Sequence, residues 1–158
     1  MRKSYLIGIL FIVIALSLPV FVTSAVSAAG KDIAVRDAKG DVSVMSQGST
    51  EWKKVDFGMM LSSGDTVKTG ADSYVDLCFD GAEEDAIVRL DANTNMKVDS
   101  YVLAKQVENK KIILDLAMGD IMVRANKLKN ESQFQVRTPT SIVGVRGTGF
   151  KVKVSAEK

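Results

Sequence analysis

The sequence predicts a single all-β domain. Short segments rich in valine, isoleucine and threonine follow one another, and turn residues separate them at intervals of roughly eight to twelve positions. After the apolar N-terminal segment, no stretch combines a helical apolar period with caps at both ends. Such closely spaced strands are typical of a sandwich, a barrel or a solenoid, and the pattern alone does not choose among these.

The expected strands are short and continue to the end of the chain. In order, they are residues 41–45, 50–55, 66–69, 73–79, 86–90, 96–104, 111–117, 120–124, 134–137 and 142–154. Glycine, asparagine and aspartate lie between most of them, as expected for tight turns. The segment 112–126 has apolar positions that would also suit a helix, but Gly119-Asp120 in its middle argues against one.

Two of these strands have one clearly apolar face. Side chains alternate between the faces of a strand, so every second residue is expected to point toward the core. In the first strand the core-facing set is Ser73, Val75, Leu77 and Phe79, which alternates with Tyr74, Asp76, Cys78 and Asp80. In the second it is Ile112, Leu114, Leu116 and Met118.

A Gly-Asp pair followed closely by an apolar residue recurs along the chain, at Gly40-Asp41, Gly64-Asp65 and Gly119-Asp120. We interpret each pair as a turn that leads into a strand. Glycine can adopt a positive φ there, and the aspartate side chain can bond the local backbone.

The C-terminal run contains a change of phase. Val143 and Val145 place apolar side chains at odd positions, whereas Phe150, Val152 and Val154 place them at even positions. One face of a regular strand cannot bury both sets unless the alternation slips by one residue. We expect a kink or bulge between Arg146 and Gly149, where glycine removes the steric cost.

The N-terminus resembles a secretory signal peptide. Arg2 and Lys3 precede an almost wholly apolar segment, residues 5–22, and the small residues Val26-Ser27-Ala28 suit cleavage after Ala28. The alternative is an uncleaved anchor, because the apolar run is near the length of about 18 residues that spans a bilayer. We expect cleavage and export to the periplasm or the extracellular space, with membrane contact only through the leader if it is retained.

Composition excludes several function classes. Without Arg2 and Lys3 the 21 basic residues fall to 19, against 19 acidic residues, so the mature chain is nearly neutral and no basic stripe favours nucleic acid. The chain has no histidine, which removes the commonest general base and most zinc or copper sites. We therefore expect no enzyme activity, no catalytic residues, no cofactor and no metal. Asp80 and the acidic residues 83–85 are interpreted as a solvated turn.

Two single residues invite a structural interpretation. Cys78 is the only cysteine, so no internal disulfide forms, and its place in a strand suggests a small residue packed in or near the core. Trp52 is the only tryptophan. It could stack on a sugar ring, but we expect it to pack on the edge of the core with Val42 and Val55.

Arg146 has two interpretations. As a structural residue it would hold the kinked strand by pairing with a carboxylate, and Asp65 and Asp120 are the candidate partners. As a binding residue it would present its planar fork of donors to an acidic partner. The structural interpretation is favoured because the neighbouring glycines leave little room for a partner.

Three motifs carry a family resemblance. They are Gly64-Asp65-Thr66-Val67-Lys68-Thr69-Gly70, Val75-Asp76-Leu77-Cys78-Phe79-Asp80-Gly81, and Thr138-Pro139 followed by Gly144-Val145-Arg146-Gly147-Thr148-Gly149-Phe150. Residues 40–154 thereby resemble the FecR-type extracytoplasmic domain, a family named for the ferric citrate regulator of bacterial envelopes. The resemblance implies a two-layer sandwich or a twisted, solenoid-like β fold.

The expected organisation follows from these features. It comprises a signal peptide at 1–28, a short lead-in at 29–39, the FecR-like domain at 40–154 and a tail at 155–158. The structural or recognition candidates are Arg146, Gly144, Gly147, Thr148, Gly64, Asp65, Asp120 and Trp52.

The resemblance also bounds the function. It implies an exported, non-enzymatic module that binds an envelope protein or a cell-wall glycan. The alternative is a sensor or regulator component of a ferric citrate-type signalling system. Only four residues precede the apolar run, so we expect no sigma-factor-binding region of its own.

Overall fold

The computed structural model describes residues 33–79, 86–104, 109–125, 132–145 and 149–155, and their regular elements are strands. Among these residues, no helix is long and apolar enough to cross a membrane. The strands are β1 Ile33–Lys39, β2 Val42–Met45, β3 Trp52–Lys54, β4 Met60–Leu61, β5 Thr66–Thr69, β6 Tyr74–Phe79, β7 Ala86–Leu90, β8 Asn95–Ala104, β9 Asn109–Ala125, β10 Gln133–Arg137, β11 Ile142–Val145 and β12 Gly149–Val154.

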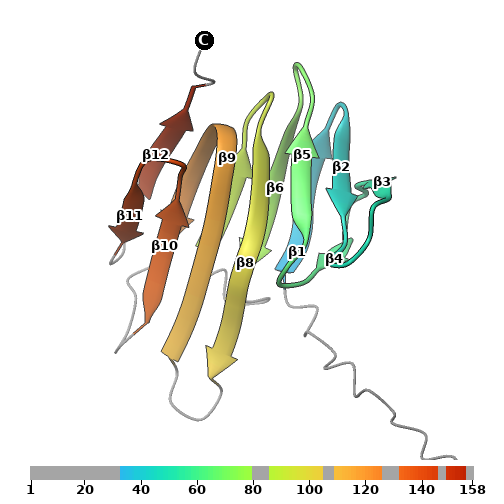
Figure 1. Ribbon diagram of the computed structural model, residues 1–158. Helices are drawn as coiled ribbons and strands as arrows, with labels where there is room; N and C mark the ends of the chain where they lie inside the picture. The colour runs from blue at the N-terminus through green and yellow to red at the C-terminus, as the bar shows by residue number, and fades with distance from the viewer. Residues whose placement is uncertain (1–32, 80–85, 105–108, 126–131, 146–148, 156–158) are drawn as a thin grey trace, which may run out of the picture.

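The strands form one strongly curled sheet, a half-barrel (Figure 1). Its main order is β3-β2-β5-β8-β9-β7-β6-β1-β4, and β10, β11 and β12 join on or beside β9. The pairings are antiparallel except that β10 runs parallel to β9. The predicted all-β single domain is confirmed, and its architecture is this half-barrel rather than specifically a sandwich or a solenoid.

Strand β9 connects the two limbs of the curl. Its first half pairs with β8 and β10, and its second half pairs with β7 and β12. We call the side with β2, β3, β5, β8, β10 and β11 the first limb, and the side with β1, β4, β6, β7 and β12 the second limb. The prediction of two separate strands at 111–117 and 120–124 is wrong, because pairing continues through the intervening residues.

The bend in β9 changes which side chains face inward. Leu116 is buried, Met118 is 41% exposed and Ile121 is buried, so the alternation slips by one residue. A register shift against β8 and a φ of 100° at Gly119 mark the place. The expectation that Met118 would share the apolar face of Leu116 is therefore wrong.

The core fills the inside of the curl with side chains from both limbs. On β6, the predicted inward set Val75, Leu77 and Phe79 is fully buried. The Phe79 ring packs edge-on against Tyr101 of β8, with ring centroids 5.5 Å apart, so the two limbs meet across the core. Burying each such side chain stabilises the fold by roughly 1.5–3 kcal/mol.

The segment Val55–Met59 crosses from one sheet edge to the other. The backbone amide of Val55 bonds the carbonyl of Val42 on β2, and the amide of Gly58 bonds the carbonyl of Val35 on β1. Strand β1 lies within the expected lead-in at 29–39 and contributes Val35 to the core. The lead-in therefore contains a strand of the sheet.

The C-terminal run forms two strands rather than the single kinked strand 142–154. β11 pairs with β10 on the first limb, whereas β12 pairs with the second half of β9. Val143 and Phe150 both pack against the core, each from its own limb, which accounts for the change of phase. The expected kink falls on residues 146–148, which lie outside the described residues.

Candidate binding surface

At the Gly64-Asp65 turn, the aspartate side chain binds two backbone amides, an arrangement that we call the Asp65 clamp. Asp65 is 6% exposed, and its carboxylate accepts hydrogen bonds from the amides of Gln47 and Ser62, at 3.0 and 2.9 Å. Gly64 has a φ of 90°, and a Cβ there would overlap the side chain of Gln47. The predicted roles, a positive φ for glycine and a local backbone bond for aspartate, are confirmed at this turn.

Asp120 is an ion-pair partner on the second limb. Its Oδ2 lies 3.4 Å from Nζ of Lys151 and 3.7 Å from Nζ of Lys153. The hydrogen bond that Lys151 donates to Asp91 and the charge of Asp120 raise the pKa of Lys151. Gly119-Asp120 lies inside β9, so the interpretation of this pair as a turn leading into a strand is wrong.

The other candidates divide into two groups. Gly144 lies in β11 and is exposed, with nothing within 4 Å of the position a Cβ would take. Arg146, Gly147 and Thr148 lie outside the described residues, so the pairing of Arg146 with Asp65 or Asp120 stays a prediction.

Trp52 does not pack on the core. It lies on the edge strand β3, opposite Met45 of β2, and is 45% exposed. All three residues of β3 are exposed, whereas Val55 just beyond the strand is buried. The expected packing with Val42 and Val55 is wrong because β3 is a short edge strand with a single neighbour. By contrast, the prediction that Cys78 packs in or near the core is confirmed, since it is 2% exposed.

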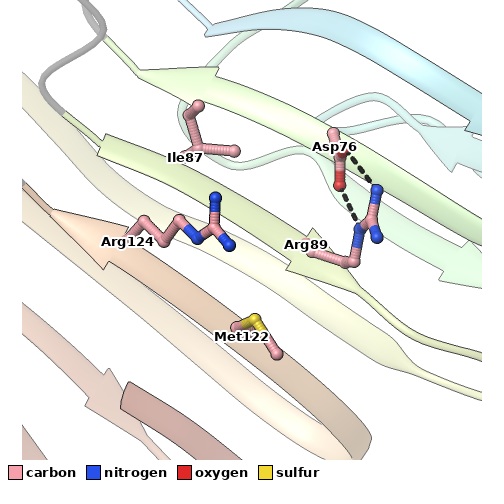
Figure 2. Close-up of a pocket in the computed structure, with 5 residues that line it drawn as sticks. All are labelled: Asp76, Ile87, Arg89, Met122 and Arg124. Atoms are coloured by element: carbon pink, nitrogen blue, oxygen red, sulfur yellow. Dashed lines mark hydrogen bonds and ion pairs between the residues drawn. The ribbon is translucent and has the colours of Figure 1, made fainter. Parts of the chain in front are cut away.

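A hollow of about 170 Å³ lies on the outer face of the second limb. We call it the arginine hollow. Its lining comes from three adjacent strands and comprises Asp76 of β6, Ile87 and Arg89 of β7, and Met122 and Arg124 of β9 (Figure 2). The cross-strand pairs Asp76–Arg89, Arg89–Met122 and Ile87–Arg124 place these outward side chains next to one another.

One side of the arginine hollow is a fixed chain of polar contacts. Nε and Nη2 of Arg89 each lie 2.7 Å from an oxygen of Asp76, which forms a two-pronged ion pair. The guanidinium also lies 4.5 Å from the centre of the Tyr74 ring, and the Tyr74 hydroxyl donates to Asp37 at 2.8 Å. These contacts fix the Arg89 side chain, and the hydrogen bonds that it donates to Asp76 raise its pKa.

The other side of the arginine hollow carries Arg124. Figure 2 shows its guanidinium extending toward Arg89, between Ile87 and Met122. Arg124 is exposed, and no carboxylate within the described segments forms an ion pair with it, whereas Arg89 is neutralised by Asp76. The hollow therefore has an available guanidinium fork beside Met122, which is 39% exposed. This combination suits a carboxylate next to an apolar group.

The arginine hollow is not among the sites predicted from the sequence. Alternation in 73–79 already placed Asp76 on the polar face, and the same rule applied to 86–90 would place Ile87 and Arg89 together. The missing information was register, because only the pairing of β7 with β9 brings Arg124 opposite Ile87. In the described part of the chain, no group of three or more cysteine, aspartate or glutamate residues is placed to hold a metal ion.

Comparison with known proteins gives one match. A family model described as FecR protein matches residues 65–158, more than half of the 158-residue chain. The matched region begins at the Asp65 clamp and includes the whole arginine hollow. No curated protein and no solved structure matches the chain.

Proposed function

The chain belongs to the FecR family, and from this premise we propose that it is an exported, non-enzymatic binding module of the bacterial cell envelope. Its partner is an envelope protein or a cell-wall glycan that carries carboxylates. The arginine hollow on the outer face of β6, β7 and β9 is the contact site.

Export is supported by the N-terminal sequence. Arg2 and Lys3, the apolar segment 5–22 and the small residues before Ala29 have the order of a signal peptide. The mature protein would act in the periplasm or outside the cell. A non-enzymatic role is supported by the lack of histidine in the chain, since the usual proton-transfer groups are then limited to carboxylates, lysines, tyrosines and one cysteine.

The single observation that carries the proposal is the charge arrangement of the arginine hollow. Asp76 neutralises Arg89 through two short contacts, and Arg124 beside it has no such partner among the described residues. An arginine fork binds a carboxylate through two parallel hydrogen bonds, and the adjoining Met122 can cover an apolar part of the same ligand. A neutral or basic partner would leave this guanidinium uncompensated.

The test is capture of partners from a bacterial envelope extract with the purified exported protein. Arg124→Glu should abolish retention of the specific partner, because it places like charge against the partner's carboxylate. Lys68→Glu is the matched control, since Lys68 is an exposed base on β5 of the first limb. Equal capture by all three proteins would contradict the assignment of this site.

Family membership favours one alternative role. In this role the chain is a sensor or regulator component of a ferric citrate-type signalling system. Deleting the gene and measuring expression of iron-uptake receptors with and without ferric citrate separates the two roles. A change in the response favours the regulator, whereas an unchanged response with loss of partner capture favours the binding module.

A further inference from the structure

The described residues form a sheet with four edge strands, and one of them lacks the usual protection against pairing with another strand. In the described segments, each of β3, β4, β11 and β12 pairs with a single neighbour. Natural proteins protect such edges with charges or by making the strand very short. Strand β3 carries Lys53 and Lys54, β12 carries Lys151 and Lys153, and β4 has two residues.

Strand β11 has four residues and carries no charged side chain, and Arg146 is the next residue in the sequence. Residues 138–145 contain no charged side chain. Ile142 is 69% exposed, and Gly144 is exposed as well. An apolar edge strand of this kind is a template for pairing with another strand. Of the four edge strands among the described residues, β11 is the one that is longer than two residues and carries no charged side chain.

The pairing of β11 with β10 fixes which backbone groups are open. The amide of Thr138 donates to the carbonyl of Ser141 at 2.8 Å, next to the pair Arg137–Ile142. This bond makes Thr138 and Ser141 a hydrogen-bonded pair. Because hydrogen-bonded and non-hydrogen-bonded pairs alternate along an antiparallel ladder, the next pair, Arg137–Ile142, is not hydrogen-bonded. The pair after it, Val136–Val143, is hydrogen-bonded, so Val143 bonds to β10. The amide and carbonyl groups of Ile142 and Gly144 therefore face away from β10, toward the open edge.

The outer face of β11 is complementary to itself. Ile142 and Gly144 lie on one face of the strand, and Val143 points the other way, toward the core. If two copies pair antiparallel through their open groups, each Ile142 lies directly opposite the Gly144 of the other copy. Nothing lies within 4 Å of the place where a Cβ of Gly144 would be, so the isoleucine has room there.

We propose that β11 is a dimerisation edge that pairs antiparallel with β11 of a second copy of this chain. Ile142 of each copy pairs with Gly144 of the other copy, which gives two residue pairs related by a two-fold axis. Within each pair, both residues donate and accept a backbone hydrogen bond. Strand β11 itself carries no charge, so the paired residues do not repel one another. The contact is smaller than a standard interface, and the dimer is therefore weak and forms at high protein concentration.

Sedimentation velocity of the purified exported protein, from about 10 µM to about 1 mM, tests this proposal. The wild type should shift from monomer to dimer over this range. Ile142→Lys guards the edge and should raise the dissociation constant at least about tenfold. Gly144→Val should do the same, because it fills the space that the opposing isoleucine occupies.

Two controls keep the outcome clear. Trp52→Lys adds the same lysine to the already guarded edge β3 and should leave the dissociation constant unchanged. Thermal unfolding at low concentration should give similar midpoints for all variants, since Ile142 is exposed and a Cβ at Gly144 meets nothing. A wild type that stays monomeric at about 1 mM, or a dimer that both β11 variants retain at full strength, overturns the proposal.

Discussion

Replacing Gly119 by alanine tests the bend of β9, on which the connection of the two limbs depends. Gly119 has a φ of 100°, and an added Cβ would lie 2.3 Å from Oγ1 and 2.4 Å from Cα of Thr94. Rotating the Thr94 side chain cannot relieve the contact with its Cα, so the backbone itself must shift. Thr94 is fully buried, and its Oγ1 accepts the amide of Asp120 at 3.0 Å.

The expected magnitude has two parts. A residue with a Cβ in a left-handed conformation costs roughly 1–2 kcal/mol relative to glycine. Forcing an extra carbon into a packed site costs about 1–3 kcal/mol more. Gly58 provides the matched control, because its φ of 77° is also positive but nothing lies within 4 Å of the Cβ position. Only the cost of the left-handed conformation applies at Gly58.

Urea denaturation of the two variants measures the difference. Gly119→Ala should lower the free energy of unfolding by about 2–5 kcal/mol, and Gly58→Ala by about 1–2 kcal/mol, with unchanged slopes. Equal losses would show that contact with Thr94 contributes nothing. The close approach of β9 to the turn before β8 would then not be what requires glycine at this position.

Three further predictions concern a titration, the leader and the C-terminal arginine. The hydrogen bond to Asp37 raises the pKa of Tyr74 above 10.0, so ultraviolet titration should find a phenol that ionises later than free tyrosine and returns toward 10.0 in Asp37→Asn. Because the pKa of Tyr74 is higher in the folded than in the unfolded protein, the bond stabilises the fold below about pH 10, and this stabilisation is lost as pH rises through the folded pKa. In Tyr74→Phe, the decrease in the free energy of unfolding at alkaline pH should be smaller by this contribution. N-terminal sequencing of exported protein should begin at Ala29, and recovery only in membranes with Met1 intact would contradict cleavage. Arg146→Ala should cost about 3–5 kcal/mol if the arginine is buried and paired, with partial rescue by lysine; an unchanged midpoint with lost partner binding would make it a recognition residue.

Local alternation predicts the strands that have one regular inward face. The expected strands 66–69 and 86–90 match β5 and β7 at both ends. Each lies between two neighbours in the sheet, so every second side chain is buried and the period of two is visible in the sequence. The predicted inward set on β6 follows from the same rule.

The strands that were missed lack that regular period. In β1 the register shifts between Val35 and Asp37, so the apolar and polar positions do not alternate along its length. Strand β4 has two residues, too few for any period. Its place is instead set by the segment Val55–Met59, whose bonds to β2 and β1 are contacts between residues far apart in the sequence.

Whether a candidate site could be predicted from the sequence also depended on knowing the strand register. Gly64 and Asp65 were found because a clamp at a turn is made by residues close in sequence, such as Ser62. The arginine hollow was not found because Asp76 and Arg124 are 48 positions apart (124 − 76) and meet only through the order of β6, β7 and β9. A single sequence specifies the face of each side chain but not the strand beside it.

Changes of phase are the local signal that comes nearest to revealing topology. The chain has one between Leu116 and Ile121, and another between Val143 and Phe150. At both places the chain leaves the first limb and continues on the second, once within β9 and once from β11 to β12. A strand that follows a curled sheet from one limb to the other must turn its backbone to keep apolar side chains inward, and glycine makes that turn possible. In a chain of this kind, a slip of the alternation next to glycine therefore indicates passage between limbs rather than the end of the sheet.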